Sequence, residues 1–189
     1  MGKTSHTTNL KLTGVYNAFN AAAALAVVHE VLPDSSPAAL IKALAEVQPA
    51  FGRGEKILVN GQSVELVLVK NPAGFRLALE SYDPAGHSTL IAINDEYADG
   101  RDMSWLWDVS FTSLAHAPVF VTGIRAYDMA LRLQYDEVPF EAVSPNMTTA
   151  LKQFLALHPA QPKRIYCTYT AMFAIRKKLA KIATVETIS

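Results

Sequence analysis

The stretch STLIAINDEYADGRDMSWLWD, residues 88–108, decides how this chain folds. Its first part, Ser88–Ile93, is an apolar run with the length of a buried strand. Its second part, Asn94–Asp108, holds four aspartates, one glutamate, one arginine and two tryptophans in fifteen residues. An acidic cluster directly after a strand is a common place for ligands or catalysis in an α/β chain. A solvated loop pinned by the two tryptophans is the simpler alternative.

Outward from this stretch, predicted strands alternate with helices of about ten residues. Asn60-Gly61 predicts a two-residue hairpin turn. The predicted strands are 56–59, 63–69, 88–93, 118–122, 140–143 and 164–167. The predicted helices are 72–81, 126–133, a segment with Ser144-Pro145 as N-cap and proline, followed by Asn146, that runs to about Leu157, and 170–182. This alternation predicts an α/β fold with a Rossmann-like, mostly parallel sheet flanked by helices.

The N-terminal part does not follow this alternation. Thr13 or Gly14 can open a helix that ends near Val31. Ser36-Pro37 opens a second one, with Ser36 as the N-cap residue and Pro37 at the first helical position. The glycine-rich segment 52–54 then separates this helical piece from the strands. We therefore expect a helical piece over residues 1–51 and an α/β domain over residues 52–189.

Composition excludes several classes of protein. Half of the residues are apolar and 18% are charged, which allows a buried core. Seventeen basic side chains balance seventeen acidic ones, so nucleic acid is not an expected partner. A single cysteine, Cys167, rules out an internal disulfide and fits a reducing compartment. No secretory signal and no membrane-spanning segment are predicted, so we expect a soluble, cytoplasmic protein.

Catalytic and metal motifs are few. The five histidines lack paired spacing and there is one cysteine, which argues against a structural zinc site. Carboxylates near Asp95 and Asp99 could hold magnesium, but such sites usually share the ion with nucleotide phosphates. Cys167 lies in a predicted strand without neighbours that would lower its pKa, so it is expected to be a buried apolar residue. No G-x-S-x-G nucleophile motif occurs.

The amides of Asn17 and Asn20 lie three residues apart, on one face of the first predicted helix. They serve either local hydrogen bonding or recognition of a base or ribose. They belong to an N-x-x-N-x-x-A-A motif at Asn17, Asn20, Ala23 and Ala24. Two further motifs are G-R-x-E at Gly52, Arg53 and Glu55 and, more loosely, D-x-Y at Asp95 and Tyr97. Together the three motifs resemble those of the Mur ligase superfamily.

Four longer stretches narrow the resemblance: L-V-K-N-P-A-G-F at 68–75, N-D-E-Y-A-D-G-R-D-x-S-W-L-W-D at 94–108, G-x-R-A-x-D-M-A-L-R-L at 123–133 and T-Y-T-A-M at 168–172. These stretches are similar to the MurT family, the ligase-like subunits of MurT–GatD amidotransferases. The resemblance covers almost the whole chain from about Leu12. The implied fold is that of a Mur ligase C-terminal domain, preceded by a helical remnant of the central ATPase domain.

The resemblance implies amidation of D-isoglutamate in the stem peptide of lipid II, giving D-isoglutamine. ATP and Mg²⁺ would activate the carboxylate in the full-length enzyme, and ammonia would come from the glutaminase partner GatD. In this family the C-terminal domain docks GatD and supplies an acidic residue to its active site. Asp102 and Asp99 are the two candidates for that acid, with Asp102 slightly favoured.

The resemblance also suggests roles for other residues. Lys70 and Asn71 would meet substrate or partner, or instead form an ion pair and an N-cap. Trp105 and its neighbour Trp107 suit either the core or a partner interface. Positions that would face ATP are Asn17, Asn20, Arg53, Asp95 and Tyr97.

A whole MurT would also carry an N-terminal domain, a P-loop and a cysteine-rich zinc ribbon before the position of Leu12. We therefore expect a fragment that holds no cofactor and does not perform the ATP-dependent step alone. A docking module without chemistry of its own is the main alternative. An independent hydrolase that uses the acidic cluster is a third possibility.

Overall fold

The computed structural model describes residues 5–12, 14–49 and 52–185. Two compact units, Met1–Ala50 and Phe51–Ser189, divide the chain. The first holds helices α1 (Val15–Val31) and α2 (Pro37–Glu46). Thr13, one of the two residues expected to open α1, lies outside the described residues, as does Phe51 at the expected boundary. The Ser36 side chain accepts a hydrogen bond from the Ala39 amide at 3.1 Å, so Ser36 caps α2 as predicted.

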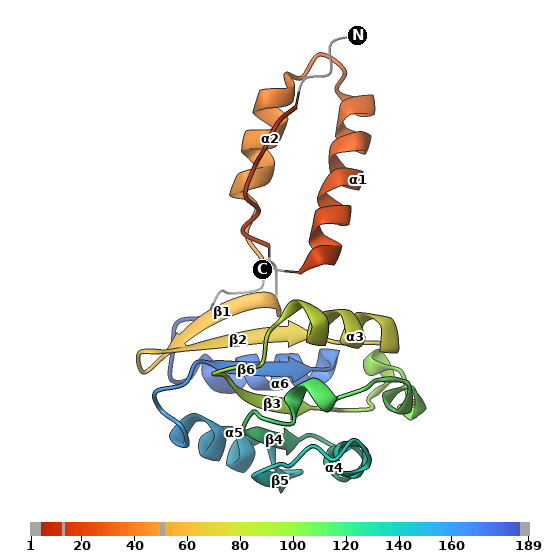
Figure 1. The fold of residues 1–189 in the computed structure, drawn as a ribbon. Coiled ribbons are helices and arrows are strands. Elements are labelled where there is room, and N and C mark those ends of the chain that lie inside the picture. The colour runs from red at the N-terminus through yellow and green to blue at the C-terminus, as the bar shows by residue number, and fades with distance from the viewer. Residues whose placement is uncertain (1–4, 13, 50–51, 186–189) are drawn as a thin grey trace. The chain divides into compact units, whose positions relative to one another are not determined.

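The second unit is built on a six-stranded sheet with strand order β1-β2-β6-β3-β4-β5 (Figure 1). Only the β1–β2 pair is antiparallel, and the other four pairs are parallel. This confirms the predicted mostly parallel α/β sheet. The strands are β1 (Arg53–Val59), β2 (Gln62–Leu68), β3 (Ser88–Ala92), β4 (Val119–Thr122), β5 (Ala142–Ser144) and β6 (Lys163–Cys167).

The β1–β2 hairpin turns at the predicted dipeptide. Asn60 has a φ of 49° and Gly61 a φ of 81°, and two successive positive φ values are those of a type I′ turn. Such a turn matches the twist of the flanking strands. It fixes the register in which Val59 faces Gln62 and places the antiparallel strand at the sheet edge.

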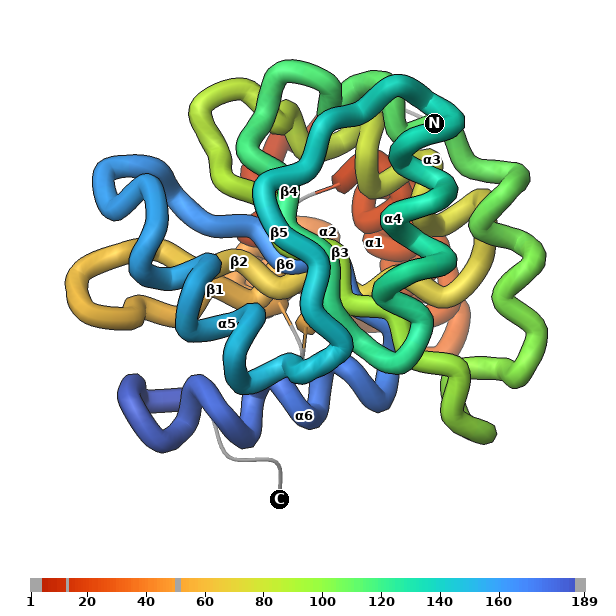
Figure 2. Tube along the Cα trace, turned by 90° about the horizontal axis from the view of Figure 1, so that it is seen from below, coloured from red at the N-terminus to blue at the C-terminus, as the bar shows by residue number. Residues whose placement is uncertain are grey.

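Four helices cover the sheet, two on each face (Figure 2). On one face lie α3 (Pro72–Ser81) and α4 (Ala126–Tyr135), and on the other α5 (Met147–Ala156) and α6 (Tyr169–Leu179). Asn71 caps α3 by accepting a hydrogen bond from the Gly74 amide at 2.7 Å. At α5 the prediction of Ser144 as N-cap is wrong, because Ser144 belongs to β5. The cap is Asn146, which accepts from two amides at 3.0 and 3.1 Å.

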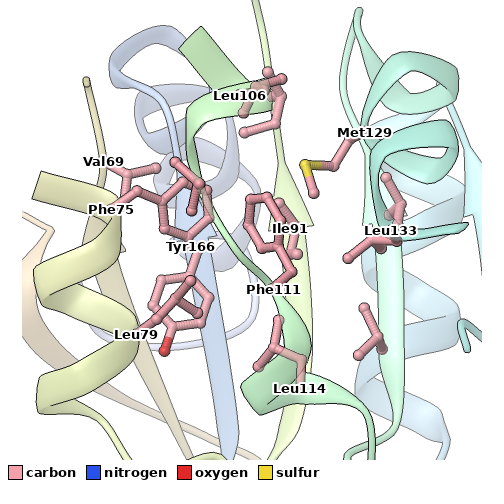
Figure 3. Close-up of a cluster of buried hydrophobic side chains, with 14 of the residues drawn as sticks. Val69, Phe75, Leu79, Ile91, Leu106, Phe111, Leu114, Met129, Leu133 and Tyr166 are labelled. Atoms are coloured by element: carbon pink, nitrogen blue, oxygen red, sulfur yellow. The ribbon is translucent and has the colours of Figure 1, made fainter. Parts of the chain in front are cut away.

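The β3–β4 connection contains no α-helix. Three short 3-10 helices replace it: η1 (Tyr97–Asp99), η2 (Ser104–Asp108) and η3 (Thr112–Leu114). Their apolar side chains fill the space between α3 and α4, so the stretch 88–108 contributes to the core (Figure 3). The buried side chains that meet there include Phe75 and Leu79 of α3, Leu106, Phe111 and Leu114 of the connection, and Met129 and Leu133 of α4.

Two buried ion pairs brace the other half of the sheet. Arg164 of β6 donates to Glu65 of β2 at 2.9 Å, and both side chains are more than nine-tenths buried. Arg176 of α6 pairs with Glu55 of β1, whose carboxylate also accepts the Gly52 amide at 2.9 Å. The glutamate of the G-R-x-E motif thus joins the edge strand to α6. Across the residues that the structure describes, no helix has the length and apolar character needed to cross a membrane.

Candidate functional site

The carboxyl ends of β3, β4 and β6 form the edge of the sheet at which the polar residues gather. Beyond β3 the chain passes to the face covered by α3 and α4, whereas beyond β6 it enters α6 on the opposite face. Such a reversal between neighbouring parallel strands opens the crevice in which α/β proteins usually bind ligands. Asn94 follows β3 here, and Thr168 follows β6.

Asn94 ties the three strand ends together. Its Nδ2 donates to Thr170 Oγ1 at 3.0 Å, and its Oδ1 accepts from the Ile124 amide at 3.0 Å. Its own amide donates to Thr168 Oγ1 at 2.9 Å. Gly123 permits this approach, because with its φ of 101° a Cβ there would lie 2.3 Å from the Ile93 carbonyl oxygen. The crevice between β3 and β6 is therefore closed by side chains of the chain itself.

Asp99 occupies the N-terminus of α6. Its Oδ1 accepts from the Thr170 amide at 2.8 Å, and its Oδ2 accepts from Thr170 Oγ1 at 2.6 Å and from the Glu96 amide at 3.1 Å. Glu96 returns a bond to the Asp99 amide, which completes a capping box. Asp99 is 3% exposed. A helix N-terminus attracts anions, and here an internal carboxylate fills that position.

Asp102 differs from Asp99 in its exposure and in its hydrogen-bond partners. It is exposed, and its Oδ1 accepts from the Ser104 amide at 2.8 Å. Hydrogen bonds from the backbone and the side chain of Ser104 hold the pKa of Asp102 below its ordinary value. The carboxylate is therefore ionised and faces outward.

A cavity of about 330 Å³ lies beside this carboxylate. We call it the Asp102 cavity. Two arginines and two aspartates contribute its charges, and a tryptophan contributes its largest apolar surface. Its lining residues are Arg101, Asp102, Met103, Ser104, Leu106, Trp107, Arg125 and Asp128.

Arg125 connects the Asp102 cavity to the end of β3. Its Nη1 lies 3.3 Å from Asp95 Oδ2, and its Nη2 lies 2.9 Å from Asp128 Oδ1. Its buried Nε has no hydrogen-bond partner. Sequence reasoning placed Asp95 among the site residues but missed Arg125, although the G-x-R-A-x-D motif carries both Arg125 and Asp128.

The two tryptophans lie in different surroundings. Trp105 is partly buried against the core and meets Phe75 edge-on, with 6.4 Å between ring centroids. Trp107 is 48% exposed and lines the Asp102 cavity. The side chain beside the acidic candidate is thus Trp107, whereas Trp105 was the tryptophan predicted to meet substrate or partner.

Arg132 holds Trp107 and the Val109 backbone in place from the buried side. It is buried, and its Nη2 donates to the Val109 carbonyl at 2.6 Å while its Nη1 pairs with Asp136 at 2.6 Å. Its guanidinium carbon lies 5.5 Å from the ring centroid of Trp107. The spacing of Arg132 and Asp136, four residues apart on a helix, is the sequence signal that could have identified the pair.

The remaining predicted site residues are spread over the chain. Asn17 and Asn20 lie in the Met1–Ala50 unit, where Asn20 Nδ2 donates to Asn17 Oδ1 at 3.5 Å. Arg53 is exposed on β1, and Tyr97 is 91% exposed. Lys70 and Asn71 were predicted either to contact substrate or partner or to form an ion pair and an N-cap. Lys70 is exposed and has no ion pair among the described residues, and Asn71 is the N-cap of α3.

Cys167 and the acidic groups offer neither a nucleophile nor a metal cage. Cys167 is fully buried, and burial raises the pKa of its thiol, the direction opposite to activation. Within residues 5–12, 14–49 and 52–185, no three histidine, cysteine or carboxylate side chains are placed to share a metal ion. Asp99, one of the two carboxylates considered for magnesium, directs its oxygens to Thr170 and Glu96.

Comparison with known proteins agrees with this geometry. Residues 68–172 match the family model for the MurT ligase C-terminal region. The MurT subunit of lipid II isoglutaminyl synthase (glutamine-hydrolyzing) from Streptococcus pneumoniae (strain ATCC BAA-255 / R6) is 34% identical over 180 residues, which span 90% of this chain and 39% of that protein.

Solved structures show the same fold at lower identity. A pseudomurein peptide ligase type C from Methanothermus fervidus superposes with a TM-score of 0.69 and 16% identity, over 96% of this chain and 39% of that one. The UDP-N-acetylmuramate-alanine ligase MurC from Thermotoga maritima gives 0.65 and 14%, over 95% and 40%. The family model covers more than half of the chain and includes the crevice, Asp102 and α4, and so this chain belongs to the MurT family, whose C-terminal ligase region it matches.

Proposed function

We propose that this chain is the C-terminal part of the ligase subunit of a glutamine-hydrolysing lipid II isoglutaminyl synthase. In this role it docks a glutaminase subunit of the GatD type and lends Asp102 to the glutaminase active site. The name of the pneumococcal relative, a subunit of such a synthase, supports this proposal. The chain spans 39% of that relative's length.

One observation carries the choice of Asp102. Asp102 is exposed, ionised and part of the cavity lining, and both of its hydrogen-bond donors come from Ser104, two residues away. Asp128, the other carboxylate of the lining, is paired with Arg125. Asp99 lacks this freedom, because three donors take up its oxygens inside the fold. An acid that completes a site on another protein has to protrude, and Asp102 meets that condition.

The chemistry of the acid follows from the needs of a cysteine–histidine pair. A carboxylate hydrogen-bonded to one imidazole nitrogen fixes the tautomer that can accept the thiol proton. It also stabilises the imidazolium that forms when the thiolate attacks the glutamine amide. The low pKa of Asp102 keeps it charged for both tasks.

The ATP-dependent step is the second part of the proposal. In the whole synthase, ATP and Mg²⁺ would activate the carboxylate of D-isoglutamate. In the α/β unit we assign Arg53 and Asp95 to nucleotide contact. In the helical unit, Asn17 and Asn20 are the separate candidates for nucleotide contact. Arg53 is exposed on β1, and an exposed guanidinium suits phosphate oxygens. Tyr97 and Lys70 remain candidates for contact with nucleotide and substrate.

Glutamine hydrolysis by the cognate glutaminase subunit tests the proposal. We expect the chain to raise the hydrolysis rate and Asp102→Asn to lower the stimulated rate about 100-fold or more, because an amide cannot hold the productive tautomer. Asp108→Asn is the matched control, since Asp108 is an exposed aspartate of the same stretch. A fully stimulating Asp102→Asn chain would show that the acid comes from elsewhere.

A docking module without chemistry of its own is the second candidate. The lining of the Asp102 cavity supports a docking role as well as a catalytic one, because arginine and tryptophan are typical of protein interfaces. Binding of the glutaminase with no change in its hydrolysis rate would support the module and exclude the catalytic contribution.

A further inference from the structure

The outer surface of α4 carries an apolar face that the fold does not use. The inner side of α4 places Ala126, Met129 and Leu133 in the core. The outer side exposes Tyr127 (67%), Leu131 (47%) and Tyr135 (70%), and Ile124, just before the helix, is 54% exposed. Spaced by four residues, Tyr127, Leu131 and Tyr135 form one stripe along the helix. Together with Trp107 we call them the aromatic face.

The aromatic face is continuous with the Asp102 cavity. Trp107 lines the cavity and also meets Tyr135 edge-on, with 5.1 Å between ring centroids. Asp128, next to Tyr127 in α4, lines the cavity as well. A molecule that reaches Asp102 therefore meets the aromatic face along the same surface.

Composition sets this surface apart from the rest of the chain. No lysine occurs between Lys70 and Lys152, so arginine is the only permanently charged basic residue in that segment. Protein interfaces are depleted of lysine and enriched in arginine, tyrosine and tryptophan. The segment 94–141 holds nine carboxylates and three arginines, although the whole chain is neutral. A complementary surface would have an apolar centre and a basic rim.

We infer that the aromatic face is the surface on which the glutaminase subunit docks, with Leu131 and Tyr135 as its main contacts. The inference rests on the proposed function of Asp102 and adds where the partner binds. An anchor beside the acid is needed, because a carboxylate serves another protein's active site only while the two proteins are held in a fixed orientation.

The buried Arg132 beneath Trp107 makes the aromatic face suitable for binding. Arg132 is held by Asp136 and the Val109 carbonyl and lies against the Trp107 ring. Trp107 is therefore fixed before any partner arrives, and a preformed aromatic surface loses little conformational entropy on association. Tyrosine and tryptophan beside buried arginine are the residue types that most often dominate binding energy.

Titration calorimetry of the full chain with the cognate glutaminase subunit tests the inference. Leu131→Asp and Tyr135→Ser are expected to weaken binding about 30-fold or more, as interface anchors do. Leu58→Asp is the matched control, because Leu58 is 68% exposed on β1, at the opposite end of the strand order. This control should bind within about twofold of the unsubstituted chain.

Asp102→Asn separates this inference from the proposed function. It should bind within about threefold and lose stimulation, whereas Tyr135→Ser should recover full stimulation at saturating concentration. If Leu131→Asp binds normally while Asp102→Asn loses stimulation, the docking surface is wrong and the role of Asp102 stands. If the unsubstituted chain binds no glutaminase, both fail.

The second occupant to exclude is another copy of the chain. The unsubstituted chain and Leu131→Asp, each sedimented without the glutaminase, should have the same mass. A homodimer that Leu131→Asp dissociates would overturn the inference, because the face would then be occupied by the chain itself.

Discussion

The two halves of the stretch 94–108 use the same residue types for opposite purposes. In the first half, Asp99 turns inward and satisfies the N-terminus of α6. In the second half, Asp102 turns outward and accepts hydrogen bonds from Ser104 alone. The comparison shows that a carboxylate's role depends on the donors that surround it, and that three residues along the chain suffice to change that role.

The largest expected effect comes from removing the inward carboxylate. Asp99→Ala leaves the Thr170 amide, the Thr170 hydroxyl and the Glu96 amide without their acceptor and should lower the free energy of unfolding by about 3 kcal/mol. Asp102→Ala should leave that free energy unchanged. Urea unfolding of the two variants measures the difference. Equal losses in both would contradict the distinction between the two halves.

Asn94 comes next, because its hydrogen bonds join the start of the stretch to the ends of β4 and β6. Asn94→Ala removes the acceptor of the Ile124 amide and the donor to Thr170 Oγ1, and should cost about 2 kcal/mol of unfolding free energy. Asn94→Asp keeps the acceptor and should cost less. Hydrogen exchange at the Ile124 amide reports the loss directly, and continued protection in the alanine variant would contradict the assigned bond.

The tryptophans give a smaller contrast of the same kind. Trp105→Ala opens the core beside Phe75 and should cost about 2 kcal/mol. Trp107→Ala should cost about half as much, since the ring is 48% exposed. Acrylamide should quench the fluorescence of Trp105→Phe more strongly than that of Trp107→Phe. The reverse order would mean that Trp105 is the exposed ring.

The smallest effect concerns the titration of Asp102. Ser104→Ala keeps the amide donor and removes the hydroxyl, so the pKa of Asp102 should rise towards its ordinary value. The carboxylate is charged above its pKa, and the acid limb of stimulated glutamine hydrolysis should therefore move to higher pH. Carboxyl-detected NMR of the two chains measures the pKa. An unchanged or lower pKa in Ser104→Ala would contradict the assigned cause.

Much of the fold follows from local sequence rules, because the decisive contacts are short-range. Asn71 and Ser36 cap helices whose first turns they touch, and Asn60-Gly61 turns a hairpin by its own backbone preference. The helix starts were therefore predicted to within a few residues. The end of α6 was less well predicted, at Ile182 rather than Leu179, because continued basic residues conceal where the helix stops.

The candidate site was less predictable, because its contacts join distant residues. Asp99 and Thr170 are 71 residues apart, so the contact that turns Asp99 inward leaves no trace in the neighbouring sequence of either residue. The E-x-x-D spacing of Glu96 and Asp99 was the available signal, as it permits the reciprocal capping box. Arg125 was missed for the same reason, since its partner Asp95 lies 30 residues away.

The absence of lysine between residues 70 and 152 has a practical consequence for anyone who labels or immobilises this protein. Reagents that couple to amines will attach dyes or surfaces to other parts of the chain and leave the aromatic face unmodified. A carbodiimide, which activates carboxylates, has the opposite selectivity. It should join Asp102 and its acidic neighbours to lysines of a bound partner, so that the crosslinked peptides report the rim of the complex.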